Sequence, residues 1–268
     1  MCDSCGCNSE DEAGIFKPGD EESGERHHHP HGPHHEHPHP KNVVEVNRDL
    51  LYANNLRAER NRGFCEGKNI FSLNLVSSPG SGKTSLLVKT ISALQDTLNF
   101  FVIAGDQQTA NDANCIKETG AEVVQVNTGS GCHLDAEMVH RAMDRLKPAE
   151  DSVLMIENVG NLVCPALFDL GETKRVVMVS VTEGEDKPLK YPHMFASSQL
   201  CLINKTDLLP YLDFNLEELK ESIQKINPKL EIIELSVKNG EGMEEWYSWL
   251  KRFAPLSSCS LGASGSID

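Results

Sequence analysis

The sequence lacks the features of exported and membrane-spanning proteins. No uninterrupted apolar run approaches the roughly 18 residues that a membrane span needs, and the N-terminus has no basic and then apolar secretory pattern. Positive charge is also scarce, because 25 Lys and Arg stand against 40 Asp and Glu, for a net charge of -15. An acidic protein repels phosphate backbones and anionic lipid. The sequence therefore predicts a cytoplasmic protein that binds neither nucleic acid nor membranes.

The nine cysteines do not form the pattern of a disulfide framework. Their number is odd, their spacing is uneven, and no export signal precedes them. We interpret some of them as metal ligands. Cys65, Cys115, Cys201 and Cys259 are interpreted as ordinary structural thiols, because buried free cysteines are common in protein cores.

The N-terminal segment, residues 1–42, differs in composition from the rest of the chain. It holds eight of the 11 histidines, and its first 40 residues hold nine acidic side chains against two basic ones. Ile15 and Phe16 are its only large apolar pair. Such a segment cannot bury enough apolar surface to offset its ordering entropy. We expect a disordered tail.

The remaining chain is long enough for one domain with short additions, since single cores usually stop growing at about 250 to 300 residues. Over residues 43–66, Val46, Leu50, Ala53 and Leu56 recur at helical spacing, which predicts an amphipathic linker helix against that domain. The domain itself is expected over residues 67–255. Residues 256–268 are expected to form a flexible C-terminal tail.

Apolar strands alternate with helical stretches after Gly67. The expected strands cover residues 71–76, 99–104, 122–126, 152–157, 175–181, 200–204 and 230–236. This alternation predicts an α/β fold of the P-loop NTPase type, a mainly parallel sheet with helices on both faces. Ligands of such a fold gather at the carboxyl ends of the strands.

A phosphate-binding loop follows the first expected strand. Residues 77–84 read Ser-Ser-Pro-Gly-Ser-Gly-Lys-Thr and lead into a helical run, which is the context of a P-loop. The residues expected around nucleotide phosphates are Gly80, Ser81, Gly82, Lys83, Thr84 and Ser85. Lys83 adds positive charge and the Thr84 hydroxyl binds Mg²⁺. Ser77 stands where glycine is commonest, a minor departure that requires a strand-like backbone; a turn without ligand is the alternative.

Guanine is the base that the sequence favours. Asn204-Lys205-Thr206-Asp207 follows an apolar strand and matches the Asn-Lys-x-Asp element of GTPases. The Asp207 carboxylate can accept from guanine N1–H and the 2-amino group, a donor pair that adenine lacks. Asn204 would support the loop and Lys205 would lie along the base. Ser236, after the last strand, resembles the second guanine-side element; a surface turn is the alternative.

Two acidic residues end strands on the phosphate side. Asp106 and Glu157 are placed to bind Mg²⁺ and to position water, and with Lys83 they are the candidate catalytic residues. Capping of the next turn is the alternative for both carboxylates. Asn161 stands where a water-orienting glutamine is typical, so unassisted hydrolysis should be slow.

Three groups of residues suggest metal binding. Cys2, Cys5 and Cys7 place three thiolates within six residues, which suits Ni²⁺, Zn²⁺ or Cu⁺. The histidine tract can hold several ions loosely, or it is an inert low-complexity tail. Cys132, His133 and Cys164 follow strands that end at one sheet edge, so they can meet; structural thiols are the alternative.

The combination of motifs resembles the HypB family of hydrogenase-maturation GTPases over nearly the whole chain. The motifs are the N-terminal Cys-x-x-Cys-Gly-Cys, the histidine tract, the P-loop, Thr-Gly-Ser-Gly-Cys-His over 128–133, Glu-Asn-Val-Gly-Asn-Leu-Val-Cys-Pro over 157–165 and Asn-Lys-Thr-Asp over 204–207.

The resemblance implies a nickel metallochaperone that forms a nucleotide-dependent homodimer. It implies a HypA-type nickel- and zinc-binding partner and delivery of nickel to the precursor of the [NiFe]-hydrogenase large subunit. It further implies a tight nickel site at Cys2, Cys5 and Cys7 and a weaker nickel or zinc site at Cys132, His133 and Cys164. Lys187 resembles a family lysine that approaches nucleotide; a solvated charged loop is its alternative reading.

Two other functions remain open at this point. A urease-type nickel GTPase has the same nucleotide site but usually lacks the N-terminal cysteine cluster. A metal-storage protein with an accessory GTPase domain would explain the histidine tract.

Overall fold

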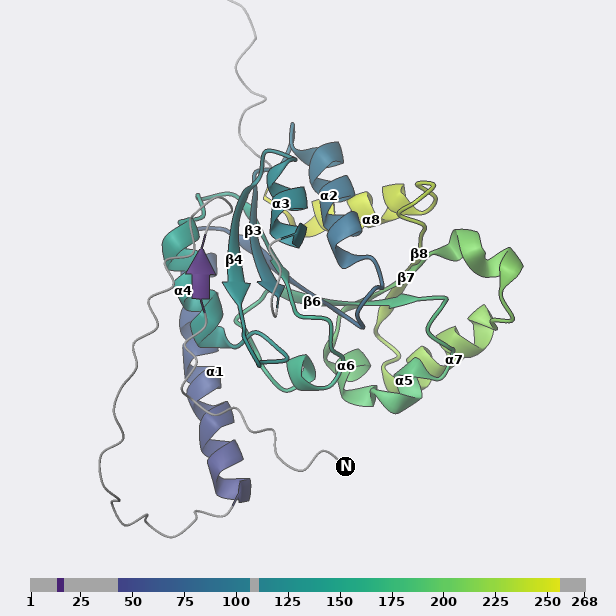
Figure 1. The fold of residues 1–268 in the computed structure, drawn as a ribbon, viewed down its shortest axis with the longest axis horizontal. Helices are drawn as coiled ribbons and strands as arrows, with labels where there is room; N and C mark the ends of the chain where they lie inside the picture. The colour runs from purple at the N-terminus through teal and green to yellow at the C-terminus, as the bar shows by residue number, and fades with distance from the viewer. Residues whose placement is uncertain (1–13, 17–42, 107–110, 256–268) are drawn as a thin grey trace, which may run out of the picture.

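A twisted sheet of eight strands forms the centre of the computed structural model, which describes residues 14–16, 43–106 and 111–255 (Figure 1). The strands are β1 (Gly14–Phe16), β2 (Phe71–Ser77), β3 (Phe100–Asp106), β4 (Glu122–Asn127), β5 (Val153–Glu157), β6 (Lys174–Ser180), β7 (Leu200–Asn204) and β8 (Glu231–Glu234). Their order across the sheet is β1-β4-β3-β5-β2-β6-β7-β8. Strands β2 to β8 pair in parallel, whereas β1 is antiparallel to β4.

The seven strands expected from the sequence are confirmed, each boundary to within two residues. They were readable because a parallel sheet is covered on both faces, so its strands are nearly continuous apolar runs. Strands β5, β7 and β2 are buried along their whole length.

Helices cover both faces of the sheet, as expected. They are α1 (Val43–Gly67), α2 (Lys83–Leu94), α3 (Asn111–Lys117), α4 (Ala136–Leu146), α5 (Lys187–Lys190), α6 (Pro192–Ser197), α7 (Leu216–Ile226) and α8 (Met243–Phe253), with short 3-10 turns η1 (Cys164–Ala166) and η2 (Thr206–Tyr211). Helices α2, α3 and α8 share one apolar cluster with one face; α1, α4, α6 and α7 pack on the other (Figure 1).

Helix α1 exists as predicted, but its predicted packing face is wrong. Leu50 and Leu56 are more than half exposed, while Asn54, Ala58 and Asn61 are buried. The side-chain amide nitrogens of both buried asparagines donate to backbone carbonyls: Asn61 Nδ2 donates to the carbonyls of Ala136 and Leu170 at 2.8 and 3.0 Å. Hydrogen-bonded amides therefore attach this helix to the domain, which apolar periodicity cannot predict.

Within residues 1–42, where the sequence predicts a disordered tail, the structure describes one segment, Gly14–Phe16. Residues Gly14–Phe16 add a short strand to the edge of β4, with Gly14 opposite Asn127 and Phe16 opposite Gln125. This pairing supplies backbone partners to an edge that would otherwise be open. The rest of that segment, and residues 256–268, lie outside the described residues.

The loops that follow β2, β3, β4, β5 and β7 all lie at the carboxyl edge of the sheet because these strands are parallel. This edge carries the candidate residues named from the sequence. Within the described ranges, no helix has both the length and the apolar composition needed to cross a bilayer.

Candidate nucleotide and metal site

A hollow of about 510 Å³ opens at the carboxyl edge between the loop after β2 and the ends of β3 and β5. It is lined by Pro79, Gly80, Gly82, Lys83, Thr84, Ser85, Gly105, Asp106, Asp112, Glu157, Asn158, Val159 and Gly160. Five of the six predicted phosphate-site residues and both candidate carboxylates thus line one space, whereas Ser81 does not line it.

The loop between β2 and α2 has the backbone shape of a phosphate cradle. Gly80 and Gly82 have φ of 74° and 105°, and the helix begins at Lys83. Positive φ at these positions favours glycine and lets successive N–H groups face one side. Ser77 is the last residue of β2, which confirms the strand-like backbone required there.

Lys83 and Glu157 face each other across the hollow in a buried setting. Burial lowers the pKa of Lys83, although the Glu157 charge opposes that shift. Burial raises the pKa of Glu157 to about 7, against the effects of Lys83 and of a hydrogen bond from Thr84. Thr84 Oγ1 donates to Glu157 Oε1 at 2.7 Å. A cation at this place would favour the ionised carboxylate.

The residues present fit a magnesium ion. Among the described residues, Glu157 Oε2 is buried without a hydrogen-bond donor, next to the Thr84 hydroxyl and in the same hollow as Asp106. Hydroxyl and carboxylate oxygens are the ligands that Mg²⁺ takes beside nucleotide phosphates. Asp112, which the sequence reading missed, lines the same hollow and acts electrostatically on both Lys83 and Glu157.

Two of the four candidate base-reading residues, Asn204 and Lys205, contact the P-loop. Asn204 Nδ2 donates to Ser81 O at 2.8 Å, and its Oδ1 accepts from Val237 N at 3.1 Å. Lys205 has φ of 65°, and its Nζ donates to Gly80 O at 2.8 Å. Ser236 Oγ donates to Asp207 Oδ1 at 2.6 Å, which orients the carboxylate. Asn204 and Lys205 thus lie against the phosphate loop.

Lys187 lies beside the P-loop, at the start of α5. Its Nζ donates to Ser78 Oγ at 3.1 Å and pairs with Glu183 at 3.4 Å. A solvated loop would leave this side chain free, so the position favours a role near nucleotide.

Cys132, His133 and Cys164 come together at the same edge. Their ligand atoms lie within 4.8 Å of one another, and the two Sγ atoms are 2.9 Å apart. Burial lowers the pKa of His133, which keeps the imidazole neutral and able to bind a metal. Two thiols and an imidazole are a donor set that suits Ni²⁺ or Zn²⁺.

Phe168 packs on the His133 ring at a centroid distance of 4.0 Å. Its backbone carbonyl accepts from Arg175 Nη2 at 2.8 Å. The ring is therefore held from one side by a fixed segment. Sequence reading missed this residue, because an aromatic side chain alone carries no signal of metal chemistry.

One loop, residues 157–164, connects the two sites. Asn158 Oδ1 accepts from Leu134 N at 3.1 Å, beside His133. Gly160 packs on the P-loop, where an added Cβ would lie 3.0 Å from Pro79. Asn161 Nδ2 donates to Cys132 O at 3.2 Å. The loop thus contacts the phosphate loop and both metal-ligand segments.

The remaining described cysteines fit their structural interpretation only in part. Cys65 and Cys201 are buried, and burial raises the pKa of both thiols, to about 11 for Cys65. Such thiols stay protonated and poorly reactive. Cys115 is exposed. Cys2, Cys5, Cys7, Cys259 and the histidine tract lie outside the described residues.

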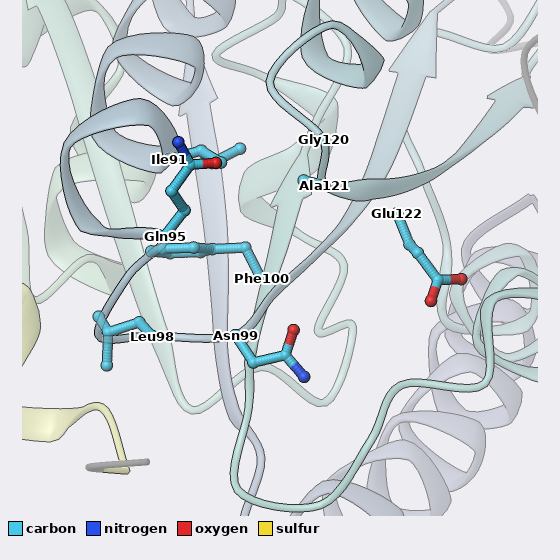
Figure 2. A pocket seen from close by; sticks show the side chains of 8 residues that line it. All are labelled: Ile91, Gln95, Leu98, Asn99, Phe100, Gly120, Ala121 and Glu122. Carbon is cyan, nitrogen blue, oxygen red and sulfur yellow. The ribbon is translucent and has the colours of Figure 1, made fainter. Parts of the chain in front are cut away.

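A second hollow, of about 280 Å³, lies at the opposite, amino-terminal edge of β3 and β4 (Figure 2). It is lined by Ile91, Gln95, Leu98, Asn99, Phe100, Gly120, Ala121 and Glu122. Glu122 is its one ionisable side chain, so its charge repels phosphate. This hollow is not a candidate for the nucleotide.

Comparison with known families finds one domain model that matches residues 72–234, described as CobW/HypB/UreG, nucleotide-binding domain. A hydrogenase maturation factor HypB from Rhizobium leguminosarum bv. viciae is 56% identical over 209 residues, covering 78% of this chain and 70% of the relative. The HypB of Escherichia coli (strain K12) is 52% identical over 238 residues, covering 88% and 82%.

Solved structures give the same result. HypB from Archaeoglobus fulgidus superposes with a TM-score of 0.71 at 37% identity, covering 75% of this chain and 98% of that one. HypB from Helicobacter pylori, solved in complex with nickel, gives a TM-score of 0.70 at 33% identity, covering 80% and 100%.

Proposed function

Because the chain belongs to the HypB branch of the CobW/HypB/UreG nucleotide-binding family, we propose that it is a GTP-hydrolysing nickel metallochaperone of hydrogenase maturation. Its cargo is Ni²⁺, and its target is the precursor of the [NiFe]-hydrogenase large subunit. One observation carries the proposal: the P-loop, the guanine-reading tetrapeptide and the Cys132, His133 and Cys164 donors share one sheet edge.

The hydrolytic part follows from the charges around the hollow. Lys83 and the P-loop N–H groups would hold the phosphates, and Thr84, Asp106 and Glu157 would hold Mg²⁺, which would supply charge neutralisation for the transferred phosphoryl group. The proposed second role of Glu157 is to orient the attacking water. Asp207 sets the preference for guanine, Ser236 orients that carboxylate, and Asn204 and Lys205 lie against the loop; Lys187 approaches from α5.

Turnover by the isolated chain should be slow. Asn161, which stands near the place of a water-orienting glutamine, has both ends of its amide in use. Its Nδ2 donates to Cys132 O and its Oδ1 accepts from Val163 N at 2.8 Å. The Asn161 amide is therefore occupied by Cys132 and Val163 and does not orient a water molecule.

The GTP state should change the affinity for nickel at the inner site. Glu157 and Cys164 belong to one loop, and Asn158 and Asn161 bind the segment that carries Cys132 and His133. A shift of Glu157 towards Mg²⁺ thus moves metal ligands as well. The N-terminal Cys2, Cys5 and Cys7 are proposed as the tighter nickel site. Zn²⁺ is the competing ion at the inner site.

Assembly with other proteins completes the proposed role. Val163 and Leu167, which flank Cys164, are each more than half exposed and give this loop an apolar surface. The proposed partners are a second copy of the chain in the nucleotide-bound state, a HypA-type nickel and zinc protein, and the hydrogenase precursor. All of this is proposed to take place in the cytoplasm.

The nucleotide and the metal are tested together on purified, untagged protein. Calorimetry with Mg²⁺ should show binding of GTP and GDP but not of ATP, and metal analysis should show nickel lost from the inner site in a Cys132→Ala/Cys164→Ala variant. Well-folded protein that binds no GTP contradicts the proposal. Complementation separates the alternatives: a urease-type chaperone restores urease rather than hydrogenase.

The storage alternative has its own test, motivated by the eight histidines of residues 1–42. Deletion of residues 24–40 should reduce total nickel bound. Hydrogenase activation at limiting nickel should be retained if delivery is the main role. Loss of activation together with unchanged GTP hydrolysis supports storage as the main role instead.

A further inference from the structure

Ser77 is the one position where the P-loop departs from the commonest pattern, and its hydroxyl makes three hydrogen bonds. Ser77 Oγ donates to Ser78 O and accepts from Ser81 Oγ and from Lys83 Nζ, each at 2.6 Å. Ser77 is fully buried at the end of β2. A glycine, which is commonest here, has no side-chain hydroxyl to donate or accept these bonds.

The bond to Lys83 matters most, because Lys83 carries the charge that phosphates need. Its side chain is 8% exposed, and within the described residues its Nζ makes one hydrogen bond, the one to Ser77 Oγ. A buried ammonium without an acceptor is strongly disfavoured. Ser77 Oγ is thus the acceptor that the structure gives Lys83.

Nucleotide binding requires the same ammonium. The P-loop lysine reaches the β- and γ-phosphates, so phosphate oxygens compete with the Ser77 hydroxyl for the Lys83 ammonium, and binding would exchange one acceptor for the other. Hydrogen bonds to charged groups are among the strong ones in proteins, so this exchange opposes binding of any nucleotide with a β-phosphate. A nucleoside monophosphate does not require the exchange.

We propose that Ser77 is the resting acceptor of Lys83 and weakens the affinity for guanosine di- and triphosphates, which favours nucleotide release. This inference rests on the proposed guanine-nucleotide site and adds a residue that sets its affinity. Ser77 is a positioning residue: it acts on the phosphates only through Lys83. It explains why a serine with three buried polar partners stands at this position.

The test compares GDP with GMP in Ser77→Ala and Ser77→Gly variants of the full chain, by calorimetry with Mg²⁺. Both variants remove the hydroxyl that accepts from Lys83 in the nucleotide-free protein. In the nucleotide-bound protein Lys83 still has the phosphate oxygens as acceptors. The dissociation constant for GDP should fall about tenfold, which corresponds to ~1.4 kcal/mol, while that for GMP should stay as in the wild type. Ser77→Thr keeps a hydroxyl and should keep the wild-type ratio.

Ser198→Ala is the matched control. Ser198 is also a buried serine that donates to a backbone carbonyl, Met194 O at 2.8 Å, but it lies at the end of α6, away from the P-loop. Its ratio of GDP to GMP affinity should not change. Denaturation of each protein without nucleotide shows whether the Ser77 variants are folded.

Two outcomes overturn the inference. They are weaker GDP binding by Ser77→Ala, and an unchanged ratio of GDP to GMP affinity, whether both affinities change equally or neither changes. Weaker GDP binding would mean that Ser77 stabilises the binding conformation of the P-loop rather than competing with phosphate for Lys83. If the wild-type chain binds no GDP at all, the proposed function fails first.

Discussion

Asn158 offers the sharpest test of the link between nucleotide and metal. Its side chain is 1% exposed and makes three hydrogen bonds, from Leu134 N at 3.1 Å, from Val159 N at 3.0 Å, and to Asn74 Oδ1 at 3.3 Å. The first connects the loop that begins at Glu157 with the residue after His133. We predict that Asn158→Ala uncouples the two sites.

The cost in stability can be worked from the contacts. Leu134 is fully buried, so truncation of Asn158 leaves its N–H without a partner. An unsatisfied buried group costs about 1–3 kcal/mol. In urea, with a slope near 3 kcal/mol/M for a chain of this size, the unfolding midpoint should fall by about 0.3–1 M.

Asn61→Ala provides a control of the same chemistry. Asn61 is also 1% exposed, and its Nδ2 donates to two buried carbonyls, but it attaches α1 rather than the 157–164 loop. The Asn61→Ala variant should show a decrease in the free energy of unfolding similar to that of Asn158→Ala. Only Asn158→Ala should lose the nucleotide dependence of nickel binding.

The assay measures nickel affinity with GDP and with a non-hydrolysable GTP analogue, in a Cys2→Ala/Cys5→Ala/Cys7→Ala background so that only the inner site is observed. The wild type should give two different affinities, and Asn158→Ala should give nearly equal ones. An undiminished difference in Asn158→Ala, or equal losses in both variants, refutes the reasoning.

Three further predictions concern single side chains. Asp207→Asn should weaken GTP binding at least about 100-fold, since the amide cannot accept from both guanine donors, and titration with GTP and xanthosine triphosphate measures the change in base preference. Burial raises the pKa of Glu157 to about 7, from 4.5 in the unfolded chain. Its contribution to the stability of the nucleotide-free chain is therefore fully present below about pH 4.5 and is lost as the pH rises through about 7. Binding of Mg²⁺ and GTP at about pH 6 should therefore release close to one proton more from the wild type than from Glu157→Gln, a difference in which the proton of the γ-phosphate cancels, and at about pH 8.5 the two proteins should release nearly equal amounts, as calorimetry in buffers of different ionisation enthalpy would show. Gly160→Ala places a Cβ 3.0 Å from Pro79 and should slow GTP hydrolysis, measured as phosphate release. A wild-type rate would show that the loop shifts to accept the Cβ without affecting the site.

The sequence predicted the parallel core well because its signals are local. Each strand is a continuous apolar run, and the P-loop and Asn-Lys-x-Asp elements are short segments whose spacing fixes their chemistry. The meeting of Cys132 with Cys164 followed from strand order, since parallel strands end at one edge.

The errors arose where a contact depends on distant partners. The face of α1 was predicted from its apolar residues, but Asn54 and Asn61 attach it through carbonyls that are far away in the sequence. Strand β1 is three residues long, and only the open edge of β4 makes it a strand. Asn158 belongs to the motif over residues 157–165, but the motif does not reveal its role, because that role is defined by the Leu134 N–H that it meets.

Thermodynamic linkage restricts how such a chain can work. If the GTP state changes nickel affinity at the inner site by some factor, nickel must change GTP affinity by the same factor. A chaperone that holds nickel more tightly with GTP than with GDP is therefore also one whose nickel-loaded form binds GTP more tightly. Loading with metal would then favour loading with nucleotide, and on the proposed mechanism hydrolysis would lower the affinity for the ion at Cys164. In that mechanism hydrolysis sets the direction of delivery, and the loop of residues 157–164, which contacts Thr84, Leu134 and Cys132, is the segment that both ligands would act through.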